Sequence, residues 1–300
     1  MNEQELISIL SETGPLTGAQ LVERTRMEVL LLWQACKKAP QIRFAGSARR
    51  FLRLDRNVQG YARLSPSIRR EFLTYTFVGL ASQIEALNAK ANELGELTKR
   101  ISGAKRDVAR ESVISAIAQL PDKETILKKA CFILAGDVVY DMSHVVSRPE
   151  KSTGEMVRGS DLDIVIVAED DLDPAIIQSL DKAIHKRKYL LLVNDREEID
   201  YLIKSIARVK EQLKFDIFSS KVACKILDEG QLLYGSPEVY QSVKNLIGEY
   251  GVPAQLRILE QQAALDRQLA EAQLLDMDPE RGLSEYLNLF YTHAEEDEIY

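Results

Sequence analysis

Two aspartates at the start of an apolar segment are the residues of this sequence best suited to chemistry. Asp161 and Asp163 are separated by one residue, and the apolar residues 164–167 that follow are typical of a buried β-strand. Side chains alternate between the two faces of a strand, so both carboxylates are expected on one face. Their repulsion and desolvation oppose folding unless a cation neutralises them. The pair therefore predicts a site for a hard divalent cation, Mg²⁺ or Mn²⁺.

A third carboxylate is expected from Asp216. It interrupts the apolar residues 213–218, which we interpret as a second strand. Three carboxylates could hold two metal ions about 4 Å apart, one activating an attacking hydroxyl and the other holding a triphosphate. Asp216 could then also help to deprotonate the attacking group. A solvent-facing acid at a strand edge is the alternative interpretation of Asp216.

These residues resemble a known superfamily. Gly159-Ser160 before the acid pair, the hydrophobic strand after it and the later Asp216 are similar to the DNA polymerase beta-like nucleotidyltransferases, over about residues 130–218. The resemblance implies a mixed sheet with helices, Mg²⁺ or Mn²⁺ at the three aspartates, and a nucleoside triphosphate substrate such as ATP. It implies transfer of a nucleoside monophosphate to an acceptor hydroxyl, on nucleic acid or protein, with release of pyrophosphate.

The same resemblance implies a phosphate-binding Gly-Ser turn after an earlier strand. The corresponding place is Gly136, but Asp137 stands where the family has Ser. A carboxylate there repels a triphosphate unless a metal intervenes. The long interval before Asp161 is interpreted as a flexible loop that supplies positive charge instead. The expected nucleotide-binding residues are Gly136, Asp137, Arg158, Gly159 and Ser160, with Arg148 and Lys151 as further cations of the loop.

The first 56 residues predict three short helices followed by two strands. Gly14 ends the first helix, Thr17 is suited to cap the second, and the third ends before Pro40. Residues 42–44 and 51–54 alternate in polarity on either side of a glycine turn and predict a hairpin. This order is that of a winged helix-turn-helix.

The predicted hairpin is basic. Through Arg56 there are nine Lys and Arg against six Asp and Glu, so the segment carries +3 and the remainder −10 of a net charge of −7. Such a wing would contact the phosphates of a nucleic acid, whereas a solvated hairpin in a protein-docking module is the alternative. The basic residues concerned are Arg43, Arg49, Arg50, Arg53 and Arg56.

The remaining segments predict an α+β protein. Residues 66–101 have the apolar spacing of one long helix, and Gly95 and Gly103 are expected to weaken or end it before a further helix over about 104–120. We expect a winged helix at 1–60, a helical connector at 61–121, a catalytic domain at 122–250, and C-terminal helices with an acidic tail at 251–300.

Composition excludes some classes of protein and leaves others open. Three scattered cysteines and three histidines provide neither paired zinc ligands nor an obvious Ser-His-Asp hydrolase. No apolar segment approaches the ~18 residues that a membrane span requires, and we expect a cytoplasmic protein. Two alternatives to the enzyme remain. One is a DNA-binding regulator with an inactive, nucleotide-sensing domain, and the other is an interaction protein, for example in a toxin-antitoxin or defence pair.

Overall fold

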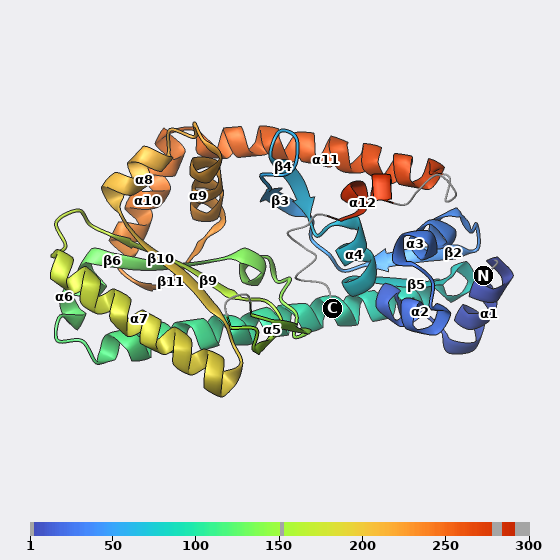
Figure 1. The fold of residues 1–300 in the computed structure, drawn as a ribbon, viewed down its shortest axis with the longest axis horizontal. Coiled ribbons are helices and arrows are strands. Elements are labelled where there is room, and N and C mark those ends of the chain that lie inside the picture. The colour runs from blue at the N-terminus through green and yellow to red at the C-terminus, as the bar shows by residue number, and fades with distance from the viewer. Residues whose placement is uncertain (1–2, 151–152, 278–283, 292–300) are drawn as a thin grey trace. The chain divides into compact units, whose positions relative to one another are not determined.

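The computed structural model describes residues 3–150, 153–277 and 284–291 and has an α+β fold (Figure 1). The chain divides into two compact units. Unit 1 is formed by the described residues of Met1–Leu97 and Leu259–Ile299, and unit 2 by those of Thr98–Ile258. The C-terminal helices thus belong to the same unit as the N-terminus. Lys151 and the expected acidic tail lie outside the described residues.

Unit 1 contains helices around a three-stranded sheet of order β1-β5-β2 and a separate β3-β4 hairpin. Its helices are α1 (Glu3–Thr13), α2 (Gly18–Thr25), α3 (Val29–Lys38), α4 (Ile68–Thr74), the first part of α5 (Ile84–Ala118), the later part of α11 (Val252–Asp276) and α12 (Ser284–Phe290). Its strands are β1 (Leu16–Thr17), β2 (Ile42–Gly46), β3 (Phe51–Leu54), β4 (Ala62–Ser65) and β5 (Thr76–Leu80), and the short helix η1 (Ala81–Gln83) precedes α5.

The three N-terminal helices are confirmed, but the expected hairpin is wrong. Thr17 and Gln20 form a capping box at the start of α2. Strand β2 pairs with β5 instead of with the residues that follow it, and β3 pairs with β4. Residues 47–75 lie between β2 and β5 in the chain and contain the β3-β4 hairpin and α4.

The predicted single helix over 66–101 is wrong in its first half, where the short helix α4 is followed by a strand. Residues 76–80 form the central strand β5, since Thr76, Phe77 and Val78 are β-branched or aromatic and fill the gap between β1 and β2. The helix begins at Ile84 and continues through both glycines to Ala118. Each glycine costs about 1 kcal/mol relative to alanine. Burial of Ala109, Val113 and Ile117 in the core of unit 2 offsets that cost.

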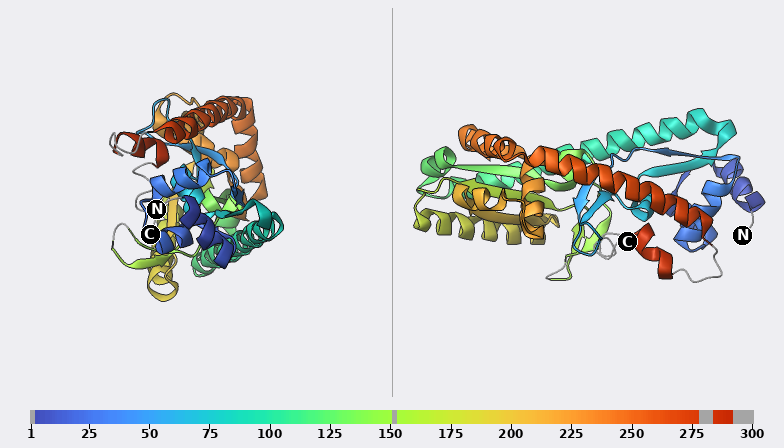
Figure 2. Two further views of the ribbon diagram at one scale, coloured as in Figure 1. Left: turned by 90° about the vertical axis from the view of Figure 1, so that its right-hand side faces the viewer. Right: turned by 90° about the horizontal axis from the view of Figure 1, so that it is seen from above.

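The C-terminal helices complete the core of unit 1. Leu274 and Phe290 are buried with residues of α1 to α4, and the rings of Trp33 and Phe290 lie 5.8 Å apart. The side-chain amide of Gln34 on α3 donates to the carbonyl oxygens of Leu274, Leu275 and Met277 at 3.1, 3.2 and 2.9 Å. Figure 1 and Figure 2 show α12 beside α4, which it contacts.

Unit 2 is a four-stranded sheet of order β10-β9-β6-β11 with helices on both faces. Its strands are β6 (Ala130–Ala135), β9 (Leu162–Ala168), β10 (Ile199–Ser205) and β11 (Gln231–Gly235), and a separate hairpin is formed by β7 (Ser147–Pro149) and β8 (Met156–Arg158). Besides the later part of α5 and the start of α11, its helices are α6 (Lys123–Lys129), η2 (Gly136–Tyr140), α7 (Pro174–Asp195), α8 (Ile206–Gln212), α9 (Phe218–Glu229) and α10 (Pro237–Glu249).

The two faces of this sheet are covered by different helices. Phe132, Leu134, Ile164 and Ile166 point to one face and pack with α5, α6 and α7. The alternate residues point to the opposite face, where α9 and α10 contact β6. Strand β9 runs parallel to β10 and antiparallel to β6. None of the helices that the structure describes is long and apolar enough to cross a membrane.

We predict that Gln34→Leu lowers the free energy of unfolding by about 1–3 kcal/mol, because buried carbonyl oxygens at the end of α11 lose their donor. Denaturant unfolding measures the loss. The control is Gln41→Leu, which changes an exposed glutamine of the same unit. Equal stability of the two variants would contradict a role for Gln34 in holding the C-terminal helices.

Candidate active site

The predicted acid pair lies at the beginning of strand β9. Asp161 directly precedes the strand and Asp163 is its second residue, as the sequence indicates. Leu162, Ile164 and Ile166 belong to the buried core on one face of the sheet. Because side chains alternate, Asp161 and Asp163 point to the opposite face, together with Val165. The pair is partly exposed there.

A second pair of acids lies beside the first on strand β10. Asp200 is the register partner of Asp163, and the amide of Leu162 donates to the carbonyl oxygen of Glu198 at 2.9 Å. Register partners on neighbouring strands point to the same face. Asp161, Asp163, Glu198 and Asp200 therefore form a two-by-two group of carboxylates at one end of the β9-β10 pair. We call this group the acid quartet.

Sequence reasoning did not identify the second pair, although a signal was present. Residues 198–203, Glu-Ile-Asp-Tyr-Leu-Ile, repeat the acid-apolar-acid-apolar pattern of residues 161–166, Asp-Leu-Asp-Ile-Val-Ile. Both segments begin a strand of the same parallel pair. The polar residues 194–197 directly precede this pattern and make its first acid look like part of a polar loop. Only the register shows that the two patterns are adjacent.

Asp216 does not lie on a strand, so the expected strand over 213–218 is wrong. The chain turns after α8, with Phe215 in the left-handed region at φ 57°, and Asp216 precedes α9. A carboxylate oxygen of Asp216 accepts a hydrogen bond from the amide of Ile217 at 2.8 Å. This bond and a second one from Ser220 hold the pKa of Asp216 below its usual value. These contacts are those of a carboxylate at a helix N-terminus.

The structure brings the Gly136 turn and the Gly159-Ser160 turn together. The Ser160 hydroxyl donates to the Asp137 carboxylate at 3.3 Å. Gly136 has φ +74°, and a Cβ atom there would lie 2.2 Å from Oδ2 of Asp163. At Gly159, with φ +60°, a Cβ atom would lie 1.8 Å from the carbonyl oxygen of His144. Close approach and positive φ thus require glycine at both turns.

The segment between the turns contains an ordered hairpin, which corrects the expected flexible loop. Strands β7 and β8 pair so that Arg148 and Val157 share one face and are buried, whereas the side chain of Arg158 is exposed. The guanidinium of Arg148 lies 2.8 Å from Glu198 and 3.5 Å from Asp161, and its Nε donates to the carbonyl oxygen of Gly159 at 2.9 Å. Of these two arginines, Arg148 is therefore the one that the structure places against the acid quartet.

Arg148 and Lys188 bring positive charge to the acid quartet. Burial, opposed by the guanidinium of Arg148, raises the pKa of Glu198, and the charges of Asp161 and Asp200 raise it further. Lys188 of α7 forms an ion pair with Asp200 at 2.7 Å. Over the described ranges of the chain, no three His, Cys, Asp or Glu side chains are grouped closely enough to hold a metal ion. Arg148 contacts Glu198 and Asp161, and Lys188 contacts Asp200.

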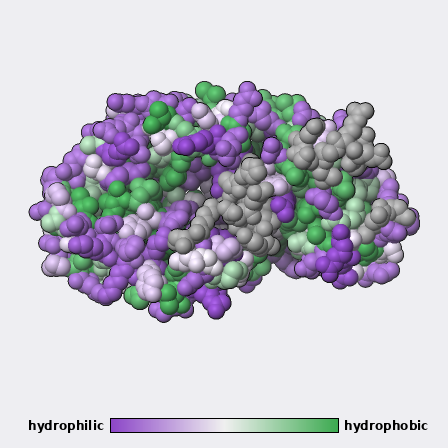
Figure 3. All heavy atoms as spheres, viewed as in Figure 1, coloured by the Kyte–Doolittle hydropathy of each residue, from purple (hydrophilic) through white to green (hydrophobic). Residues whose placement is uncertain are grey.

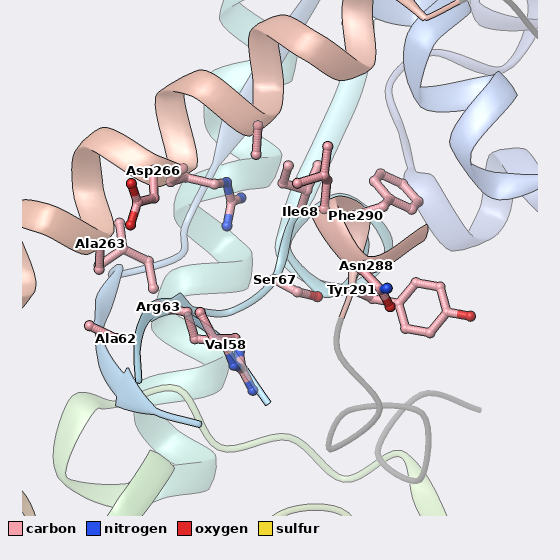
Figure 4. Close-up of a pocket in the computed structure, with 14 residues that line it drawn as sticks. Val58, Ala62, Arg63, Ser67, Ile68, Ala263, Asp266, Asn288, Phe290 and Tyr291 are labelled. Atoms are coloured by element: carbon pink, nitrogen blue, oxygen red, sulfur yellow. The ribbon is translucent and has the colours of Figure 1, made fainter. Parts of the chain in front are cut away.

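Unit 1 contains a cavity of about 130 Å³, lined by residues that include Arg63, Ser67, Asp266 and Tyr291 (Figure 4). Its arginines already have carboxylate partners. Arg63 pairs with Asp55 at 3.1 Å, and Arg267 pairs with Glu71 at 2.7 Å. The cavity therefore has a structural ion-pair network in its wall, and we place the candidate active site in unit 2.

Comparison with known proteins identifies no relative of this chain. No family model matches the chain, and neither a curated protein nor a solved structure is significantly similar to it. The case for function therefore depends on the residues and geometry of the site.

We predict that Gly136→Ala destabilises the protein more than Gly154→Ala does. Both glycines have nearly the same φ, +74° and +73°, but a Cβ atom at Gly154 has no neighbour within 4 Å. The backbone cost of about 1–2 kcal/mol is therefore common to the two variants. The contact with Asp163 should add about 1 kcal/mol or more at Gly136. Denaturant unfolding compares them, and equal losses would show that Asp163 does not press against the turn.

We predict that Arg148→Met lowers the free energy of unfolding by about 3 kcal/mol at pH 7, because a buried Glu198 loses its partner. The variant also loses the guanidinium that opposes the rise in the pKa of Glu198. A carboxyl with a raised pKa is most favourable to folding in its protonated form, so the deficit should shrink as the pH falls from 7 towards 4.5. Denaturant unfolding at several pH values measures this.

Arg158→Met is the matched control for the same hairpin, because the side chain of Arg158 is exposed. It should change stability by less than about 0.5 kcal/mol. A deficit of Arg148→Met that stays constant with pH, or one that Arg158→Met reproduces, would contradict the assigned contacts.

Proposed function

We propose that unit 2 is a metal-dependent nucleotidyltransferase, which transfers a nucleoside monophosphate from a nucleoside triphosphate to an acceptor hydroxyl and releases pyrophosphate. The observation that carries the proposal is the acid quartet at the end of the β9-β10 pair. Carboxylates at neighbouring positions of paired strands repel one another, which favours a fold that uses them to bind cations. The glycine turn at Gly136 lies directly beside Asp163.

The donor set fits Mg²⁺ or Mn²⁺ in its chemistry, since all its oxygens are hard ligands. We assign Asp161, Asp163 and Asp200 as the metal-binding carboxylates, with Asp200 in place of Asp216. Binding requires Asp161 and Asp200 to exchange Arg148 and Lys188 for the metal. Those are the weaker contacts, because one is 3.5 Å long and the other is a half-exposed surface pair. The Arg148-Glu198 contact, at 2.8 Å, can remain.

We assign the proton transfer and the phosphate binding of this reaction to groups of the protein. A bond forms between the acceptor oxygen and the α-phosphorus, and the bond from that phosphorus to the bridging oxygen breaks as pyrophosphate leaves. We assign Asp200 to accept the proton of the acceptor hydroxyl, since it is the most exposed member of the catalytic set. The backbone at Gly136 and the Gly159-Ser160 turn contact the phosphates. A bound metal ion would offset the charge of the triphosphate and of the departing pyrophosphate.

For unit 1 we propose a docking role instead of sequence-specific DNA binding. In winged helix-turn-helix proteins the helix equivalent to α3 enters the major groove. Here Trp33 and Gln34 of α3 are buried, and Gln34 holds the end of α11. Of the basic residues, Arg43 donates to backbone carbonyls and Arg50 pairs with Glu71 and Glu271. These contacts favour a protein-docking module over a DNA-reading one.

We predict that the protein releases pyrophosphate from at least one ribonucleoside triphosphate with Mg²⁺ or Mn²⁺ when RNA, DNA or lysate protein is present as acceptor. Asp161→Ala with Asp163→Ala should abolish the release, because the metal loses two ligands. Asp200→Asn should lower kcat at least about 100-fold, the range for loss of a general base. Asp216→Asn is the control and should retain most of the activity.

Two results would count against these assignments. Loss of activity in Asp216→Asn with full activity in Asp200→Asn would return the third position to Asp216. Nucleotide binding without pyrophosphate release from any acceptor would favour the alternative function, a nucleotide-sensing regulator.

A further inference from the structure

A groove lies further along the face of the sheet that holds the acid quartet. It has a volume of about 270 Å³ and lies between strands β9 and β10 and helices α8 and α9. Its walls are mostly apolar, with Val165, Leu202, Val222 and Ile226 among the lining residues. Leu202 is 44% exposed. Figure 3 shows hydrophobic residues gathered over this part of unit 2.

Of the four polar residues that line the groove, Lys204, Gln212 and Arg208 present hydrogen-bond donors, and Ser219 can donate or accept. Lys204 is buried, and its ammonium donates to the side-chain oxygen of Gln212 at 2.9 Å. An ammonium only donates, so the oxygen of Gln212 must face Lys204, which leaves the two amide hydrogens of Gln212 as its further donors. Arg208, which also lines the groove, only donates, and one of its guanidinium nitrogens pairs with Glu211 at 2.7 Å. Burial lowers the pKa of Lys204 to about 8, so the side chain is mostly protonated at neutral pH.

The position of the groove relates it to the acid quartet. Val165 and Leu202 follow Asp163 and Asp200 by two residues, about 7 Å along the strands, and Lys204 follows Asp200 by four, about 13 Å. A ligand with phosphates at the carboxylates would therefore reach the groove with its other end. The volume is below the ~300–1,000 Å³ of pockets for drug-sized ligands, which suits one flat ring system.

We infer that this groove binds the base of the nucleoside triphosphate and selects a base with carbonyl acceptors, guanine or uracil, over adenine. The inference rests on the proposed function for the phosphate end of the ligand. Guanine presents two adjacent acceptors, N7 and O6, and uracil presents carbonyl oxygens, whereas adenine presents one acceptor, N7, beside an amino group that donates. In the groove that amino group would face the donors of Lys204, Gln212 and Arg208. The apolar walls contact the faces of the ring in either case.

The experiment is calorimetric titration of the full chain with GTP, UTP and ATP in the presence of Mg²⁺. GTP or UTP should bind at least about tenfold more tightly than ATP, a difference of about 1.4 kcal/mol. Lys204→Met removes the buried donor while keeping the length of the side chain, and it should abolish the preference. Ala223→Leu fills the groove and should weaken all three nucleotides at least about tenfold. The control Lys210→Met changes an exposed lysine of the same helix as Arg208 and should behave as wild type.

Equal affinity for the three nucleotides, a preference for ATP, or a preference that survives Lys204→Met would overturn the inference. These outcomes are independent of catalysis. Pyrophosphate release that depends on Asp161 and Asp163 but shows no base preference would support the proposed function and contradict base selection by the groove. Base-selective binding that Lys204→Met abolishes, with no pyrophosphate release, would support base selection by the groove and contradict the proposed reaction.

Discussion

The parallel pairing of β9 with β10 places two acid-apolar-acid segments side by side. Each segment alone would be a modest local cost, since two carboxylates two residues apart repel one another on a partly exposed strand end. In register, the pairs form the acid quartet, and the surrounding segments are arranged around its charge. The β7-β8 hairpin brings a buried arginine to it, and α7 contributes a lysine. The backbone at Gly136 and Gly159 approaches neighbouring atoms so closely that a side chain at either position would overlap them.

The two faces of the sheet in unit 2 have different roles. One face is packed with α5, α6 and α7 and supplies the hydrophobic burial that stabilises unit 2. The other holds the carboxylates at one end of β9 and β10 and the apolar groove further along, beneath α8 and α9. Because alternate residues of the same strands serve the two purposes, a slip of one residue would bury the acids and expose the core. Stability and the candidate site therefore depend on the same register.

Unit 1 joins distant parts of the chain in one core. The N-terminal helices pack with α11 and α12, and Gln34 on α3 donates to three carbonyl oxygens near the end of α11. A buried amide that donates to backbone carbonyl oxygens is costly to remove, so the C-terminal helices are held specifically. Helix α3 is thereby used for internal packing.

The sequence by itself determined the local features. The acid pair on its strand and the three N-terminal helices, with the cap at Thr17, could be predicted from spacing and residue type, because these features depend on neighbours along the chain. It did not determine pairing between distant segments. Whether β2 pairs with β3 or β5, and whether Asp200 or Asp216 approaches Asp163, depends on long-range packing that overrides local propensity. Likewise, Arg148 and Arg158 look alike in sequence, and only the hairpin register decided which of them faces the carboxylates.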